Sequence, residues 1–149
     1  RGLYTFIKLT VPPPSMILFD ASNRDQCEVK RSKTNTPLQA LMMMNDPLVM
    51  EASRVLAQRL LEEQSASSEK ITKAFRLIIC RKPTAKEIAV LEGYFKEQQE
   101  LYQQKKTDAA IMIKKGEYPA AKKIDVNEQA ALMKTIGAIY NLEEAITKT

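Results

Sequence analysis

The densest group of side chains that could do chemistry lies near the start of the chain. It comprises five residues within sixteen positions: Asp20, Arg24, Cys27, Arg31 and Asn35. An Arg–carboxylate pair can fix irregular backbone, and an Asn amide can satisfy several backbone groups at a turn. The group therefore suits a structural latch. It equally suits a site for an anion or a carbohydrate rim, with Arg24 and Arg31 as donors. A third alternative is a nucleophilic Cys27, which only Lys30 or Arg31 could activate.

The sequence contains no histidine, and this excludes several kinds of chemistry. Ser-His-Asp and Cys-His catalysis, His-ligated zinc and CxxCH haem attachment are all impossible within the chain. Its two cysteines, Cys27 and Cys80, form no CxxC pair, although a disulfide between them stays open. We therefore expect no metal site and no cofactor in this chain.

Two further patterns that might indicate chemistry favour packing or solvation instead. Met42, Met43 and Met44 are consecutive and would point in different directions on a helix, so they cannot chelate a soft metal without other ligands. Adjacent carboxylates such as Glu62 and Glu63 also diverge, whereas a glycosidase pair must face across a cleft. We expect the methionines to pack in the core and the carboxylates to be solvated.

The net charge of +5 is unevenly distributed along the chain. Residues 1–35 carry +3, residues 36–66 carry −2 and residues 67–107 carry +4. A basic excess is typical of binding to nucleic acid or anionic surfaces. Here the basic residues alternate with Glu and no aromatic–basic stripe is present, which favours a solvated helical surface over nucleic-acid binding. No apolar run is long enough to span a membrane.

The elements that position these side chains are of two kinds. Residues 1–35 predict an extended arm packed on the body, because Pro12, Pro13 and Pro14 oppose both helix and central strand and favour polyproline II. From Thr36 onward the apolar period is helical. Expected helices open at Thr36-Pro37, run from Asp46 to about Glu63, cover 71–79, extend from Thr84 through Tyr102, cover 107–115 and open again at Asp125.

Local signals support these boundaries. Pro83 is expected to end the helix before it, Thr84 and Glu87 form a T-x-x-E capping box, and Gly116 suits the position after a helix. On the helix after Asp46, the expected buried face carries Val49, Ala52, Leu56 and Leu60. The helix after Asp125 offers two overlapping apolar sets: Val126, Ala130, Met133, Gly137 and Tyr140, or Leu132, Ile136 and Ile139. The prediction is an all-α fold, a bundle of five or six helices over residues 36–149 in one domain with its arm.

Several runs of this sequence also resemble a known family. They include Val-Pro-Pro-Pro-Ser-Met at 11–16, Thr-Asn-Thr-Pro-Leu-Gln-Ala-Leu at 34–41, Asn-Asp-Pro at 45–47, Arg-Lys-Pro-Thr at 81–84 and Asn-Leu-Glu-Glu at 141–144. The chain resembles the planctomycete-specific PSD-one domain of unknown function, over nearly its whole length. Cys80 stands where that family commonly has Gly. The resemblance therefore favours an incidental Cys80 and a packed Cys27 thiol over a disulfide.

The resemblance implies a setting for the chain. It is similar to the C-terminal domain of large exported bacterial proteins, which often carry a cytochrome-c-like module and are linked to polysaccharide use. Any haem would lie in that other module. We expect a fragment of a larger protein, acting as an accessory or interaction domain that docks on its upstream domain. The alternatives are a share in a glycan-processing site through Arg24, Arg31 and Asn35 and, less favoured, nucleic-acid binding through residues 67–107.

Overall fold

The computed structural model describes residue 6 and residues 12–21, 29–30, 34–63, 66–104, 106–119 and 124–146. Every regular element in these ranges is a helix, which confirms the predicted all-α class. The chain divides into two compact units, residues 1–42 and 43–149. Their boundary falls within a helix, seven residues after the predicted end of the arm at residue 35. That the arm packs on the body stays a prediction.

The first unit contains a helix where only extended backbone was expected. Helix α1 (Pro14–Leu18) begins at the third proline of the run, with Pro13 as its N-cap. The prediction of polyproline structure through Pro14 was wrong because proline, with a fixed φ and no N–H, fits the first turn of a helix. The Met16 amide donates to the Pro13 carbonyl at 2.9 Å, and the Ala21 amide to the Met16 carbonyl at 2.8 Å. Helix α2 (Pro37–Asn45) follows.

The second unit is a bundle whose helices after Asp46, Thr84 and Asp125 begin as predicted, whereas the short helix over residues 143–146 was not predicted. Its helices are α3 (Pro47–Glu62), α4 (Ser67–Ile79), α5 (Ala85–Gln104), α6 (Lys106–Met112), α7 (Val126–Tyr140) and α8 (Glu143–Ile146). The Asp46 carboxylate caps α3 by accepting the amides of Leu48 and Val49 at 2.8 and 3.2 Å. Thr84 and Glu87 form the predicted capping box of α5. These caps are local, so the sequence alone identifies them.

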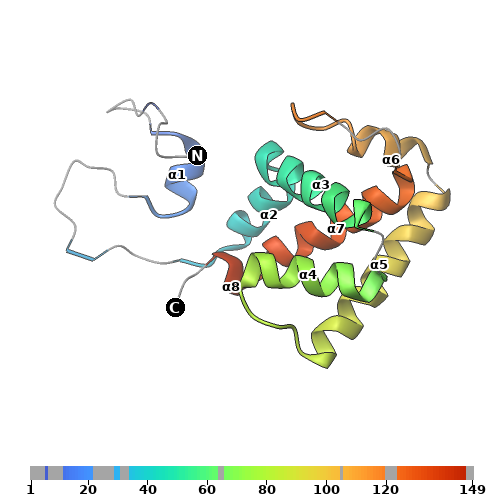
Figure 1. Ribbon diagram of the computed structural model, residues 1–149. Coiled ribbons are helices and arrows are strands. Elements are labelled where there is room, and N and C mark those ends of the chain that lie inside the picture. The colour runs from blue at the N-terminus through green and yellow to red at the C-terminus, as the bar shows by residue number, and fades with distance from the viewer. Residues whose placement is uncertain are drawn as a thin grey trace. The chain divides into compact units, whose positions relative to one another are not determined.

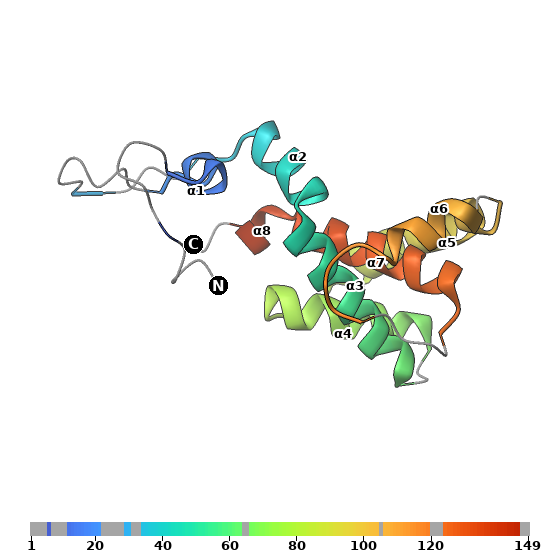
Figure 2. The ribbon, with the colours of Figure 1, turned by 90° about the horizontal axis from the view of Figure 1, so that it is seen from above.

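Helix α7 is the centre of the second unit. It contacts α3, α4, α5, α6 and α8, and in Figure 1 it runs between α3 and α5. Figure 2 shows the same unit from above, with α6 beside α5. Both apolar sets predicted for this helix contribute to the core, since Ala130, Met133, Leu132, Ile136 and Ile139 are all buried. The sequence shows two apolar sets on this helix because a central helix has no fully solvated face.

The buried face of α3 differs from the predicted one. Ala52, expected inside, is exposed, and Val49 and Leu56 are only half-buried. The buried side chains are Met50, Ser53, Arg54, Ala57, Leu60 and Leu61. The prediction was wrong because Ser53 and Arg54 interrupt the apolar period of the true core face. Ser53 satisfies its hydroxyl by donating to the Val49 carbonyl at 2.8 Å.

Residues Glu51 and Arg54 of α3 hold the loop formed by residues 113–119. The Arg54 Nε and Nη2 donate to the carbonyls of Lys115 and Tyr118 at 3.1 and 2.6 Å. The Glu51 Oε1 accepts the amides of Glu117 and Tyr118 at 2.8 and 2.5 Å. Between these contacts Gly116 adopts a φ of +96°, and a Cβ there would lie 2.7 Å from the Glu51 side chain. We call Glu51, Arg54 and this loop the α3 clamp.

Two predicted helix bounds need correction. Helix α6 ends at Met112 and not at Lys115, because residues 113–119 bend back onto Glu51 and Arg54 of α3, so Gly116 belongs to the loop and not to a helix end. Helix α4 ends at Ile79 as predicted but begins at Ser67, in a stretch that was expected to be a loop. Cys80 adopts the left-handed conformation, with φ of 64°, and its amide donates to the Arg76 carbonyl at 3.0 Å. This is a helix-ending conformation that normally belongs to glycine.

Candidate functional site

The structure places two of the five predicted site residues. Asp20 and Asn35 are described, and both belong to the first unit. Arg24, Cys27 and Arg31 lie outside the described residues, so their proposed roles as anion donors or as a thiol nucleophile stay predictions. The geometry of this group of five residues is therefore described only at its two ends, Asp20 and Asn35.

Asp20 closes the arm onto the segment that precedes α2. Its Oδ2 accepts the backbone amide of Thr34 at 2.8 Å and the hydroxyl of the same residue at 2.7 Å. The backbone of Asp20 has a φ of 53°, a left-handed conformation that Asp tolerates better than most side chains. The carboxylate thus bridges fourteen positions of sequence and joins Thr34 to the end of the α1 segment.

Gln39 is the centre of this cluster, although it was not among the predicted site residues. Only 1% of its surface is exposed. Its Nε2 donates to the Leu18 carbonyl at 2.7 Å and to the Thr34 hydroxyl at 3.1 Å. Its Oε1 accepts a hydrogen bond from the backbone amide of Thr36 at 3.1 Å, while the Thr36 hydroxyl accepts one from the backbone amide of Gln39 at 3.3 Å. The last two bonds are a T-x-x-Q capping box, a sequence signal that could have identified Gln39.

We call Asp20, Thr34, Thr36, Gln39 and the Leu18 carbonyl the Gln39 latch. Asn35 is exposed, and the hydrogen bonds of the latch pass through the threonines on either side of it. Both functional atoms of the Gln39 amide and one carboxylate oxygen of Asp20 are engaged with the chain itself. This is the chemistry of a brace between α1 and the start of α2.

A second polar cluster, in the other unit, joins the turn after α4 to α8. The Arg81 guanidinium forms two hydrogen bonds to Glu87, at 2.6 and 3.0 Å, and two to Glu144, at 2.8 and 3.0 Å. It also lies over the Phe75 ring, 4.9 Å from the centroid. Planar forks of this kind fix geometry as well as charge. We call Arg81, Glu87 and Glu144 the Arg81 fork.

The electrostatics of the Arg81 fork exclude an acid–base role at neutral pH. Hydrogen bonds from Arg81, and then from Thr84, lower the pKa of Glu87 from 4.5 to about 2. The hydrogen bonds from Arg81 also lower the pKa of Glu144. In turn, the hydrogen bonds to Glu87 and Glu144 raise the pKa of Arg81. A general acid or base needs a pKa near the working pH. Both carboxylates stay ionised, and the fork is a structural connection.

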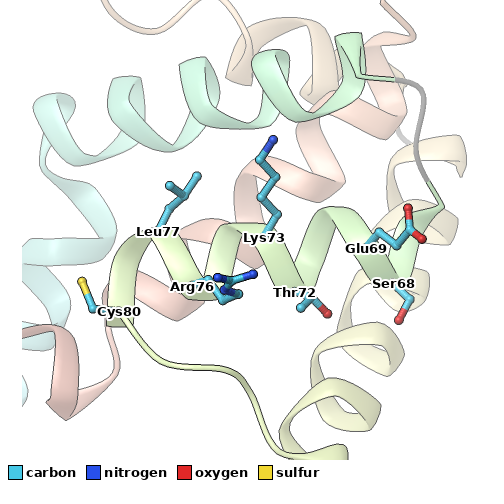
Figure 3. Close-up of a pocket in the computed structure, with 7 residues that line it drawn as sticks. All are labelled: Ser68, Glu69, Thr72, Lys73, Arg76, Leu77 and Cys80. Carbon is cyan, nitrogen blue, oxygen red and sulfur yellow. The ribbon is translucent and has the colours of Figure 1, made fainter.

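A shallow groove of about 540 Å³ runs along the exposed face of α4 (Figure 3). The described residues that line it are Ser68, Glu69, Thr72, Lys73, Arg76, Leu77 and Cys80. These described residues come from α4 and its C-cap. Lys73 pairs with Glu63 at the end of α3, and the Cys80 thiol is free and exposed. The groove is an amphipathic surface suited to contact and carries no assembled catalytic group.

Several basic residues of the segment 67–107 form ion pairs. Lys70 pairs with Glu128 at 3.2 Å, Lys73 with Glu63, and Arg81 with two carboxylates. These pairs reduce the positive potential available to a phosphate backbone. The geometry therefore adds no support to nucleic-acid binding.

Among the residues that the structure describes, no three Cys, Asp or Glu side chains come together as a metal-binding group. Within the same residues no helix combines the length and the apolar character needed to cross a bilayer. The clusters that do form are the Gln39 latch, the α3 clamp and the Arg81 fork, and all three connect elements of the fold.

The fold and these clusters define an all-α domain braced by buried and half-buried polar side chains. Comparison with family models then gives the family: the PSD1 model, described as a protein of unknown function (DUF1553), matches residues 1–95. The chain belongs to this family. No curated protein and no solved structure matches it. The matched region contains the Gln39 latch and two members of the Arg81 fork, Arg81 and Glu87.

Proposed function

We propose that the chain is a non-catalytic interaction domain of an exported multidomain bacterial protein, and that it docks on the preceding domain of the same polypeptide. The proposal extends to a role of that protein in polysaccharide use. Export and polysaccharide use rest on the resemblance described above. The absence of histidine from the sequence supports a non-catalytic role, as does the engagement of the polar clusters in bracing the fold.

The observation that carries the proposal is the surface of α2. Leu38, Leu41 and Met44 follow one another at three-residue spacing, and each is more than half exposed, at 56%, 56% and 57%. Exposed apolar side chains in a row along one helix are typical of a surface that a partner covers. We call these three residues the α2 row.

The size of the α2 row favours a partner in the same polypeptide. A stable complex of separate proteins buries about 800 Å² on each partner, which is more than three side chains supply. A partner tethered by the chain needs less area, because the link gives it a high effective concentration. The α2 row is therefore better matched to a neighbouring domain than to a freely diffusing protein.

Hydrogen exchange on the full-length protein encoded by the gene tests this proposal. Amides of α2 should exchange more slowly in the full-length protein than in this chain alone, because the preceding domain covers the helix. The double variant Leu38→Ser, Leu41→Ser should remove that difference.

The matched control is Val90→Ser, Ile111→Ser, which replaces two apolar side chains of α5 and α6 that are somewhat more exposed than Leu38 and Leu41. It should leave the protection of α2 in the full-length protein unchanged. Equal exchange of α2 in the full-length protein and in this chain would refute the docking role.

A further inference from the structure

The second unit contains a cavity that gathers most of the methionines of the protein. The sequence has seven, and five line this one cavity of about 120 Å³: Met43, Met44, Met50, Met112 and Met133. They come from α2, α3, α6 and α7, so only the folded unit brings them together. The remaining two, Met16 and Met42, belong to the first unit. We call this cavity the methionine pocket.

The methionine pocket has the size of one small apolar group. An engineered apolar cavity of about 150 Å³ holds a benzene molecule. Thioether side chains are flexible and polarisable, so they adapt to an aromatic or branched guest and make favourable contacts with a ring. On the α7 wall, Gly137 has no side chain and Ala138 only a methyl group, so this wall leaves room for a guest.

Polar and charged side chains complete the wall. Lys134 and Tyr94 line the pocket together with the methionines. Among the residues that the structure describes, the Lys134 ammonium forms no ion pair and the Tyr94 hydroxyl no hydrogen bond. A second ammonium, that of Lys115, lies 3.9 Å from the Met50 sulfur. The cavity is thus apolar in its body and cationic at its edge.

The charge at the edge decides between two kinds of guest. Thioether ligands suit a soft cation such as Cu(I). Two ammonium groups beside the thioethers would repel a cation and attract an anion. The same lysines are suited to a carboxylate, for which an ammonium is a strong hydrogen-bond donor.

We propose that the methionine pocket binds a small monocarboxylate whose body is a single ring or a branched chain of about six carbons. The apolar body occupies the space between the methionines and Gly137. The carboxylate pairs with Lys134 and accepts a hydrogen bond from the Tyr94 hydroxyl. Met44 belongs both to the methionine pocket and to the α2 row, but this assignment does not rest on the docking role proposed above.

Benzoate titration of the protein labelled with ¹³C at the methionine methyl groups tests the proposal. Saturable shifts are expected for the five lining methionines, with Met16 and Met42 as internal controls that do not respond. Benzyl alcohol, which has the same ring and no charge, should bind at least tenfold more weakly. In Lys134→Gln that difference between the two probes should shrink to about twofold, because the charge-assisted bond is lost.

Filling the pocket provides the structural control. Gly137→Leu places a side chain in the cavity, since a Cβ there meets only the Ser53 hydroxyl, at 4.0 Å. This variant should lose benzoate binding at least tenfold. The matched variant Gly93→Leu puts the same side chain on α5, where nothing lies within 4 Å, and should bind as the parent does. Should Gly137→Leu fail to unfold cooperatively, Ala138→Leu fills the same wall.

Three results would overturn the proposal. The first is the absence of methyl shifts with 10 mM benzoate. The second is benzoate binding that both filling variants retain. The third is a response of the same methyl groups to Ag⁺, a stable substitute for Cu(I), without a response to benzoate, which would assign the pocket to a soft metal.

Discussion

The Nη2 of Arg54 donates to the carbonyl of Tyr118 at 2.6 Å, across 64 positions of sequence. Arg54 is 1% exposed and is among the largest fully buried side chains of the described chain. Its Nε donates to a second carbonyl of the same loop, while Nη1 has no hydrogen-bond partner among the described residues. A buried guanidinium of this kind connects a core helix to a loop that has no regular structure of its own. The α3 clamp therefore makes the loop a part of the bundle.

Replacing Arg54 by alanine should destabilise the protein by about 2–4 kcal/mol, because the change leaves a cavity and removes donors from two carbonyls. Urea unfolding followed by circular dichroism measures the loss. The matched control is Arg59→Ala on the same helix, where the side chain is exposed, and it should stay within about 0.5 kcal/mol of the parent. A loss below 1 kcal/mol for Arg54→Ala would show that the α3 clamp is not a major source of stability.

The Arg81 fork should make stability depend on pH in the acid range. Its Arg81 and Thr84 hydrogen bonds lower the pKa of Glu87 from 4.5 to about 2. A depressed folded-state pKa stabilises the protein above the unfolded value, and this contribution disappears as the pH falls from about 4.5 towards 2. The difference in urea midpoint between the parent and Glu87→Gln should therefore be full at pH 6 and nearly absent at pH 2.

A double-mutant cycle provides the control for Glu87. In an Arg81→Gln background, Glu87→Gln should lower the urea midpoint at pH 6 much less, because Glu87 has already lost its principal partner. If the urea midpoints of the parent and Glu87→Gln differ by the same amount at pH 6 and pH 2, the link between Glu87 and Arg81 does not contribute to the loss of stability in acid.

Local signals predicted much of the fold, and long-range contacts account for what they missed. Asp46, Thr84 and Asp125 were recognised as caps because each acts on amides within three residues. The buried face of α3 was misassigned because the reason for burying Arg54 lies in a loop more than sixty residues away. Pattern counts treat a buried arginine as solvated, so they shift the apparent apolar face.

The candidate sites show the same division between local signals, which the sequence contains, and long-range contacts, which it does not reveal. Asp20 was singled out for its type and its place among polar residues, yet its partner Thr34 followed from no periodic signal. Gln39 carried a T-x-x-Q spacing that would have marked it, but its bond to the Leu18 carbonyl depends on a chain path that sequence spacing does not specify. The methionine pocket was beyond prediction, because single methionines from several helices become a group only after folding.

Cys80 should be a site where glycine stabilises the fold. Its φ of 64° is a left-handed conformation that costs a side chain with a Cβ about 1–2 kcal/mol. Part of that gain is offset because glycine is more flexible in the unfolded chain, so Cys80→Gly should add about 0.5–1 kcal/mol. Lys82→Gly is the control, since this exposed residue two positions on lacks a positive φ and should lose stability. A lower urea midpoint for Cys80→Gly would contradict the prediction.

Two other glycines should respond in opposite directions to the same change. Gly93 lies inside α5, and a Cβ there meets nothing within 4 Å, so Gly93→Ala should stabilise the protein by about 1 kcal/mol through helix propensity. Gly116 has a φ of +96°, and its Cβ would lie 2.7 Å from Glu51, so Gly116→Ala should cost about 1–3 kcal/mol. Thermal and urea unfolding measure both. If Gly116→Ala is neutral, the loop rearranges freely and the close approach to Glu51 does not constrain it.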